Sequence, residues 1–329
     1  MKKQHLAISR GTYVGKSVVV AIFLCGVLGS GPNLARRHDR SEVATVPKAA
    51  NLTTEYPVGT SPNAVIFDGT NIWVANRGSN SVTKLRASDG SNVGTFSVGS
   101  GPQFLAFDGA NIWVANTSSN NVTKLRASDG VNLGTYAVGT RPEGVVFDGA
   151  SIWVGNAENA NITKLRASDG SNLGTFAVGA SPHGVAYDGA NIWVSNEASN
   201  SLTKLRASDG AILGTFVAGR TPNGLAFDGA NIWVGNEESS NLTKLRASDG
   251  STLGTFAVEA SPRGLAFDGA NIWAANEGSN TVTKLRASDG STLGTFPVGT
   301  KPHGVTFDGA NVWVANLGSN TVTKLRPSK

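Results

Sequence analysis

The sequence predicts an all-β protein, a seven-bladed β-propeller whose blades are four-stranded antiparallel sheets of 40 residues. A tryptophan recurs at a constant spacing of 40 residues, at Trp73, Trp113, Trp153, Trp193, Trp233, Trp273 and Trp313. Each unit also combines β-forming residues with turn signals, which at this period is typical of a propeller blade. Helical repeats of similar length are the alternative, but each unit is interrupted by glycines, a proline and two Asp-Gly turns.

The first unit shows how a blade is built. Residues 62–68 and 71–76 are apolar runs joined by Asp68-Gly69, a hairpin signal, and we name them strands a and b. Residues 81–87 and 93–98, separated by a Ser-Asp-Gly turn, are strands c and d. Strands a and b are nearly continuously apolar, as expected for strands covered on both faces. The tryptophan of strand b is therefore expected between blades, and strand c partly in water.

The two ends of the repeat array predict how the ring closes. The seventh unit stops after its strand c and lacks a strand d. Residues 53–58 precede the first unit at the spacing of a strand d, and Tyr56-Pro57-Val58 matches Phe296-Pro297-Val298 six periods later. A proline is tolerated in an outer edge strand. Residues 53–58 are therefore expected to pair with the last strand c, which removes an unpaired sheet edge.

The formal net charge of +5 comes mostly from the N-terminal segment. Residues 1–40 contain seven of the 28 Lys and Arg residues and one of the 23 Asp and Glu residues, so the repeat array is nearly neutral. This argues against a nucleic-acid partner. Lys84 and Arg86 of strand c, with their copies, form a belt of cations. We expect these side chains to lie in solvent and to pair with the Asp of the Ser-Asp-Gly turns.

The N-terminus predicts export. Lys2, Lys3, Arg10 and Lys16 precede an apolar run over residues 17–28 that is followed by small residues. Residues 1–31 therefore read as a signal peptide, with an uncleaved membrane anchor as the alternative. Residues 32–50 read as a flexible linker and residues 51–329 as the propeller. The expected location is extracytoplasmic: periplasmic, cell-surface or secreted. The single cysteine, Cys25, lies in the apolar run, so the mature chain has no disulfide.

The repeat also resembles a known family. Pro-x-Gly-Val-x-x-Asp-Gly, Trp-Val-Ala-Asn and Ser-Asn-x-Val-Thr-Lys-Leu resemble the YVTN-type (YncE-like) propeller repeat, with residues 73–76 in the place of Tyr-Val-Thr-Asn. The resemblance covers residues 53–326 and implies architecture more than activity, because such propellers include surface-layer, periplasmic and binding proteins as well as enzymes. More distantly, the chain resembles the seven-bladed streptogramin (virginiamycin B) lyases. That resemblance implies His and Glu chemistry near the central channel with a magnesium ion.

The two faces of the disc differ in sequence. The a–b and c–d turns are copied almost unchanged, which indicates a structural role. On the opposite face, formed by the b–c and d–a loops, two positions vary from blade to blade, which marks a candidate ligand-binding face. The position after the strand a proline reads Asn63, Gln103, Glu143, His183, Asn223, Arg263 and His303. The position after the strand b asparagine reads Arg77, Thr117, Ala157, Glu197, Glu237, Glu277 and Leu317.

Within one blade these two positions are expected to lie close together, and a single blade then joins a base to an acid. His183 and Glu197, fourteen residues apart, could form an imidazole oriented by a carboxylate and able to move a proton. The opposing interpretation is an ordinary contact on a mixed polar rim. The chain departs from the lyases, since the other histidine of this kind, His303, is three blades away. No metal-ligand spacing, phosphate-binding loop or nucleophile motif is present in the sequence.

Two functions remain open at this point. The favoured one is an exported, monomeric binding module without a cofactor, whose partner is a protein, a cell-envelope component or a small molecule. Membrane contact is expected only through an uncleaved N-terminal anchor. The alternative is a carbon-oxygen lyase or a hydrolase that uses His183 and Glu197 with Mg²⁺. The near identity of the repeats favours binding, because an active site needs several coordinated departures in neighbouring blades.

Overall fold

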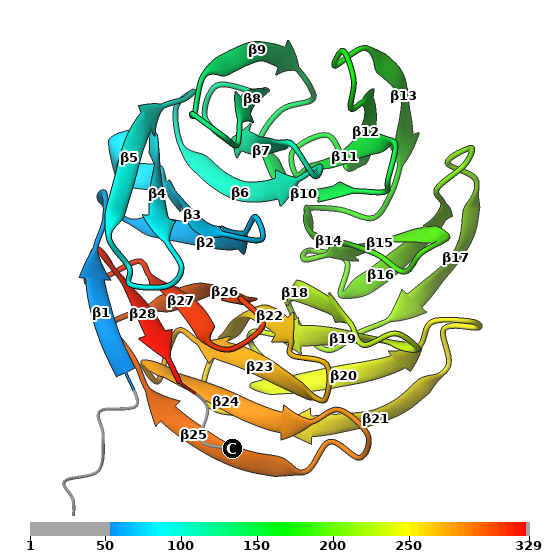
Figure 1. Ribbon diagram of the computed structural model, residues 1–329. Coiled ribbons are helices and arrows are strands. Elements are labelled where there is room, and N and C mark those ends of the chain that lie inside the picture. Colours follow the sequence, from blue (N-terminus) through cyan, green and yellow to red (C-terminus); the bar gives the residue numbers. More distant parts are fainter. Residues whose placement is uncertain (1–52, 327–329) are drawn as a thin grey trace, which may run out of the picture. The chain divides into compact units, whose positions relative to one another are not determined.

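A computed structural model describes residues 53–326, which form seven four-stranded antiparallel sheets arranged as a ring (Figure 1). The predicted fold class is confirmed. The predicted signal segment (1–31) and linker (32–50) lie outside the described residues. In the first blade each predicted strand agrees with the observed one within one residue. The part of the chain that the structure describes contains one short 3-10 turn, η1 (Arg77–Ser79), and no helix that could cross a membrane.

The strands follow the same order in every blade, from the centre of the ring outwards. The innermost strands are β2 (Pro62–Phe67), β6 (Pro102–Phe107), β10 (Pro142–Phe147), β14 (Pro182–Tyr187), β18 (Pro222–Phe227), β22 (Pro262–Phe267) and β26 (Pro302–Phe307). The second strands are β3 (Asn71–Asn76), β7 (Asn111–Asn116), β11 (Ser151–Asn156), β15 (Asn191–Asn196), β19 (Asn231–Asn236), β23 (Asn271–Asn276) and β27 (Val312–Asn316).

Two further sets complete the sheets. The third strands are β4 (Ser81–Arg86), β8 (Asn121–Arg126), β12 (Asn161–Arg166), β16 (Ser201–Arg206), β20 (Asn241–Arg246), β24 (Thr281–Arg286) and β28 (Thr321–Leu325). The outer strands are β5 (Asn92–Ser97), β9 (Asn132–Ala137), β13 (Asn172–Ala177), β17 (Ile212–Val217), β21 (Thr252–Ala257), β25 (Thr292–Pro297) and, in the seventh blade, β1 (Thr53–Pro57).

The N-terminal strand closes the ring. β1 pairs antiparallel with β28 in the register Thr53↔Leu325 to Pro57↔Thr321, so the last sheet has the order β1-β28-β27-β26. The Tyr56 ring stacks on Trp313 with 5.6 Å between ring centroids, and the Thr321 hydroxyl donates a hydrogen bond to Glu55. The first and last strands of the array are thus held in one sheet, as the sequence predicts.

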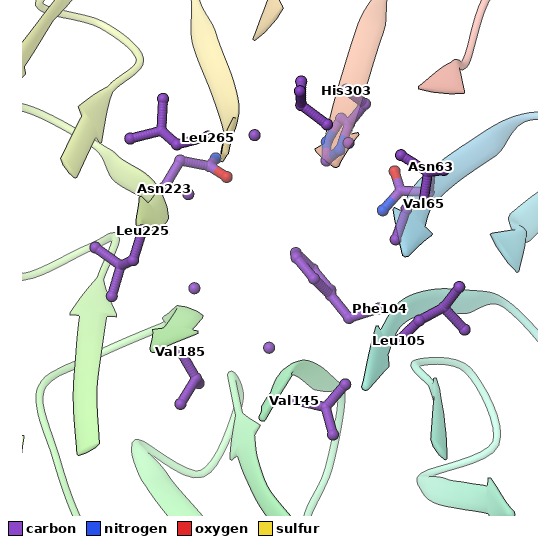
Figure 2. Close-up of a pocket in the computed structure, with 17 residues that line it drawn as sticks. Asn63, Val65, Phe104, Leu105, Val145, Val185, Asn223, Leu225, Leu265 and His303 are labelled. Carbon is purple, nitrogen blue, oxygen red and sulfur yellow. The ribbon is translucent and has the colours of Figure 1, made fainter. Parts of the chain in front are cut away.

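The innermost strands carry an irregularity that shapes the centre of the ring. In β10 the pairing with β11 skips from Pro142 to Val145, so residues 143 and 144 form a bulge. A side chain at Gly144 would place its Cβ 2.1 Å from the His183 carbonyl oxygen of the next blade, so glycine permits this close approach. In β6 the pairing resumes one residue earlier, at Phe104, and Phe104 projects into the central space (Figure 2).

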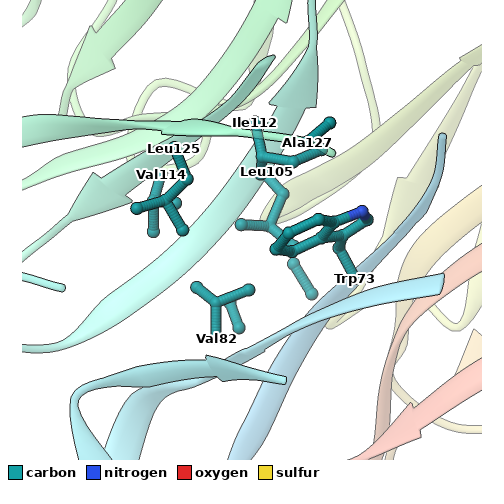
Figure 3. Close-up of a cluster of buried hydrophobic side chains, with 9 residues drawn as sticks. Trp73, Val82, Leu105, Ile112, Val114, Leu125 and Ala127 are labelled. Carbon is teal, nitrogen blue, oxygen red and sulfur yellow. The ribbon is translucent and has the colours of Figure 1, made fainter. Parts of the chain in front are cut away.

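The hydrophobic core is divided among the interfaces between neighbouring blades. One cluster joins Trp73 and Val82 of the first blade to Ile112, Val114 and Leu125 of the second (Figure 3). All seven tryptophans have 0% exposed surface. Each donates its indole N–H to the aspartate of the a–b turn, at 2.7 to 2.8 Å, as Trp73 does to Asp68. The predicted packing of the tryptophans between blades is therefore confirmed, and the copied aspartate has a structural cause.

The belt of strand c cations divides into two kinds. The arginines pair with the turn aspartates as predicted, for example Arg86 with Asp89 at 3.1 Å. The prediction for the lysines is wrong: Lys84 is only 5% exposed and donates hydrogen bonds to the carbonyl oxygens of Ala127 and Ser128 in the next blade. Its Nζ also lies 5.1 Å from the Trp73 ring centroid. Strand c is therefore buried, and the half-exposed strand is strand d.

Candidate ligand-binding face

Backbone hydrogen bonds bring the two variable positions of each blade to one rim. The d–a loop accepts hydrogen bonds from the b–c loop, as in Arg77 N–H to the Ser61 carbonyl and Gly78 N–H to the Thr60 carbonyl. Strand a therefore starts where strand b ends. We call the surface formed by these loops and by the two variable positions the variable face.

Three of the seven predicted pairs within a blade are in direct contact. Thr117 Oγ1 donates to Gln103 Oε1 at 3.3 Å, and Asn223 Nδ2 donates to Glu237 Oε2 at 3.4 Å. Arg263 Nε donates to Glu277 Oε2 at 2.6 Å. The other four pairs, which include His183 with Glu197, show no hydrogen bond or ion pair between their side chains within residues 53–326.

Contacts between neighbouring blades, which the sequence analysis did not anticipate, are as short as those within a blade. His183 Nε2 lies 3.1 Å from Glu143 Oε2 of the preceding blade, whose other oxygen lies 2.9 Å from Arg141 Nε. Arg263 Nη1 lies 2.6 Å from Glu237 Oε2, so this guanidinium is held between two carboxylates. The position after the strand a proline belongs to the innermost strand, where the ring is narrowest. The carboxylate beside His183 is therefore Glu143 and not Glu197.

Burial controls the charge of the Glu143–His183 pair. Glu143 is 1% exposed and His183 is 4% exposed. Burial raises the pKa of Glu143 to about 7, the Arg141 guanidinium opposes this rise, and repulsion from Glu197 adds to it. Burial also lowers the pKa of His183 well below its usual value, and the positive charges of His303, when it is protonated, and of Arg263 add to that effect. His183 is therefore neutral near pH 7.

Two further residues of the variable face have shifted pKa values. Burial lowers the pKa of His303 to about 4, and Arg263 adds to the decrease. Burial raises the pKa of Glu237, which Arg263 opposes, while Glu277 and Glu197 contribute repulsion. Glu197 belongs to blade four, the blade between those that carry Glu143 and Glu237, and its charge raises the pKa of both carboxylates.

Below the rim, the centre of the ring contains a pocket of about 190 Å³. We call it the central pocket; its lining comes from all seven innermost strands. Its walls carry one aliphatic side chain from each blade: Val65, Leu105, Val145, Val185, Leu225, Leu265 and Val305. Figure 2 shows Phe104 projecting into the space between these walls, with Asn63, Asn223 and His303 at other positions around it. The pocket thus combines an apolar wall with a few polar groups, as small-molecule sites commonly do.

Phe104 is a candidate site residue that the sequence analysis missed. Its ring meets His183 edge to face, with centroids 5.1 Å apart and an interplanar angle of 83°. The signal was visible in the sequence, because this position holds glycine in five blades, alanine at Ala64 and phenylalanine at Phe104.

The resemblance to the streptogramin lyases implies a magnesium ion near the central channel. Within residues 53–326, no three His, Cys, Asp or Glu side chains are grouped so that they could hold a metal ion. Glu237 and Glu277 both contact the Arg263 guanidinium, at 2.6 Å each.

Comparisons with known proteins place the fold among seven-bladed propellers. No known protein family and no curated protein matches the sequence. Among solved structures, the chain is similar to a hydrazine synthase of Kuenenia stuttgartiensis, with a TM-score of 0.74 and 19% identity over 82% of this chain and 97% of that chain. It is similar to a streptogramin B lyase (TM-score 0.72, 20% identity, 83% and 97% covered). It is also similar to virginiamycin B lyase of Staphylococcus aureus, with a TM-score of 0.72 and 18% identity over 84% of this chain and 99% of that chain.

At these identities the similarity is one of fold. The assignment to the YVTN-type repeat stays a prediction.

Proposed function

We propose that the protein is an exported binding module that holds a ligand or partner on the variable face. The observation that carries the proposal is the variable face, where the side chains differ from blade to blade around the central pocket although the blades are otherwise near copies. A copied framework with one variable rim is the arrangement expected when a rigid scaffold carries a binding site. The partner is a protein, a cell-envelope component or a small molecule.

The experiment compares a variant changed on the variable face with a control variant changed on the opposite face of the disc. The test variant carries Arg77→Gln and Glu197→Gln on the variable face; the control carries Arg206→Gln and Asp209→Asn, an exposed ion pair in the c–d turn of blade four. Ligands are screened by thermal shift, because a ligand that binds the native state raises the melting temperature. Shifts lost in the test variant and kept in the control support the proposal. Equal loss in both variants would contradict it.

Export is part of this proposal and has its own test. The charged, apolar and small-residue order of residues 1–31 supports a cleaved signal, with an uncleaved anchor as the alternative. N-terminal sequencing of the native protein should give a start near residues 30–32 in an extracytoplasmic fraction. A soluble cytoplasmic protein that retains Lys2 would contradict it.

One contact favours a second candidate function, a lyase or hydrolase. His183 is neutral and lies 3.1 Å from Glu143, so it could accept a proton from a substrate while the carboxylate stabilises the resulting imidazolium. Glu197, the acid expected to be its partner, would then act from the rim. Replacement of His183 by Ala should lower turnover by about 10²- to 10⁴-fold while the fold survives. If the wild type does not open a streptogramin-type lactone, with or without magnesium, this candidate is rejected.

A further inference from the structure

The outer strand of the fourth blade, β17, differs from the outer strands of the other blades. It begins with Ile212, where the outer strands of blades one, two, three, five and six begin with asparagine or threonine. It ends with Val217, where the matching position holds serine, alanine or proline. Both side chains are exposed, Ile212 by 56% and Val217 by 80%. Two exposed apolar changes on one strand of a nearly copied array mark this strand as a candidate contact surface.

The exposed side chains of β17 lie on the face of the strand that turns away from the core. On the other face, Phe216 is partly buried and packs on Trp193. The pairing with β16 skips from Gly214 to Ile212, and this bulge turns Ile212 to the same side as Val217. Leu213, at the bulge, is also 43% exposed. The strand thus carries exposed apolar groups near both of its ends.

The outer edge of β17 has unpaired backbone groups. The strand lies at the rim of the ring and is the last of its sheet, so within residues 53–326 no strand pairs with its outer side (Figure 1). The Ala218 N–H donates inwards to the Asn200 carbonyl. Because these groups alternate in direction along an antiparallel strand, Thr215 and Val217 turn theirs outwards. Blade six agrees, since Pro297 occupies the position of Val217 and has no N–H.

The charges that flank β17 favour a partner of the same sequence. Sheet edges are commonly protected by charged residues or proline, and β17 itself contains neither. Asp209 precedes the strand and Arg220 follows it, and both are exposed, in ion pairs with Arg206 and Glu238 of the same chain. Blade four alone has an arginine at the position of Arg220, where the others have threonine, serine or alanine. An antiparallel copy of the strand brings each flanking charge near its opposite.

We propose that a second copy of the chain covers this edge, with the two β17 strands paired antiparallel about a two-fold axis at Thr215. Thr215 then lies opposite itself, and Val217 of each copy lies opposite Leu213 of the other, next to Ile212. The pairing occupies the free edge of both strands, so association stops at a dimer. The variable faces of the two copies point in opposite directions and stay open. This inference goes beyond the proposed binding function and departs from the monomer that the sequence analysis expects.

Sedimentation velocity of the native protein from about 1 to about 200 µM tests the association. We expect a concentration-dependent change from monomer to dimer and no larger species. Ile212→Asn combined with Val217→Ala introduces the residues of blade three and should weaken the dimer at least about tenfold, without lowering the melting temperature. Val131→Ser is the matched control. It removes an exposed valine beside β9, introduces the serine of four other blades, and should leave the dimer unchanged.

A cysteine at the two-fold axis tests the register. In a Cys25→Ser background, Thr215→Cys places two thiols about 5.5 Å apart at their Cα atoms, within reach of a disulfide, and mild oxidation should give a cross-linked dimer. Thr175→Cys, at the same position of blade three, should stay monomeric. A monomer at every concentration, association beyond two chains, or a dimer unaffected by the changes at Ile212 and Val217 would overturn the inference. Equal cross-linking of the two cysteine variants, or none at Thr215, would also overturn it.

Discussion

At the residue scale, the copied Asp of each a–b turn and the Trp of strand b act as one unit. In blade four, Asp188 Oδ2 accepts the Trp193 indole hydrogen at 2.8 Å, and Asp188 Oδ1 accepts the backbone N–H groups of Ala190 and Asn191. The carboxylate therefore satisfies a fully buried donor and shapes the turn at once. This explains why a half-buried turn residue on the face opposite the variable face is repeated without change.

Replacement of Asp188 by Ala should leave the Trp193 N–H buried without a partner. The loss should lower the free energy of unfolding by about 1 to 3 kcal/mol, measured by urea denaturation. Trp193→Ala should cost more, about 3 to 5 kcal/mol, because it also opens a cavity between two blades. Asp209→Asn, in an exposed turn, serves as the control. An Asp188 variant as stable as this control would show that the indole hydrogen bond contributes nothing.

His303 predicts a dependence of stability on pH. Its pKa is about 4 in the folded protein, below its usual value of 6.5, so the unfolded chain binds the proton more tightly. The stability contributed by neutral His303 is present above pH 6.5 and is lost as the pH falls towards 4. Glu143, with a raised pKa, acts in the opposite sense between pH 4.5 and 7.

The contribution of His303 to the pH dependence of stability is therefore measured as the difference between the wild type and a variant without this histidine. His303→Gln uses the amide that Gln103 already provides at the matching position of blade two. When the pH is lowered from 7 to 5, the free energy of unfolding of the variant should rise by about 1 to 2 kcal/mol relative to that of the wild type. Thermal unfolding over this range measures the effect. A difference that does not change with pH would contradict the assigned titration.

At the element scale, the strand boundaries were predictable because turn residues mark them in every unit. The burial of strand c was not, because the pattern Thr-Lys-Leu-Arg shows alternation but not which polar side chain finds a partner in the next blade. Lys204 reaches the carbonyl oxygens of Ala247 and Ser248, whereas Arg206, two residues on and on the same side of the strand, stays in solvent. Such contacts depend on the packing of two blades, which a single repeat does not reveal.

The same limit applies to the candidate site. The variable face was predicted from the differences between blades, and the pairs Arg263–Glu277 and Asn223–Glu237 were found. The contact of His183 with Glu143 depends on how closely two innermost strands approach each other, which glycines such as Gly144 permit. Contacts between neighbouring blades therefore decide which side chains meet, and a pairing inferred within single blades does not predict them.

Lys204 and Arg206 provide a matched pair of variants on one strand. Lys204→Met removes two hydrogen bonds to carbonyl oxygens and a cation 5.1 Å from the Trp193 ring centroid, and we expect a loss of about 2 to 3 kcal/mol of stability. Arg206→Met removes an exposed ion pair and should cost less than about 1 kcal/mol. Denaturant unfolding measures both. Equal effects would mean that the buried lysine does not hold the blades together.

At the scale of the whole molecule, stability depends on closure of the ring. The blades bury their apolar residues against each other, so each hydrophobic cluster forms only when both adjacent blades are in place. The interface between the seventh and first blades is joined by β1, whose Tyr56 packs in a cluster with Val65, Ile72 and Trp313. A repeat array without this strand would leave the edge of β28 unpaired.

Deletion of residues 53–58 should therefore lower stability more than any single substitution considered above. The deletion removes five ladder positions against β28 and exposes the apolar surface that Tyr56 and Val58 cover, and we expect a loss of several kcal/mol. Tyr56→Ala should reproduce part of this loss, because it removes the contact with Trp313 and leaves the backbone pairing intact. Differential scanning calorimetry compares the deletion and the substitution with the full-length protein. A deleted protein that melts together with the full-length chain would mean that the ring closes through the contacts of β2 with β26 and β27 alone, without the strand that completes the seventh blade.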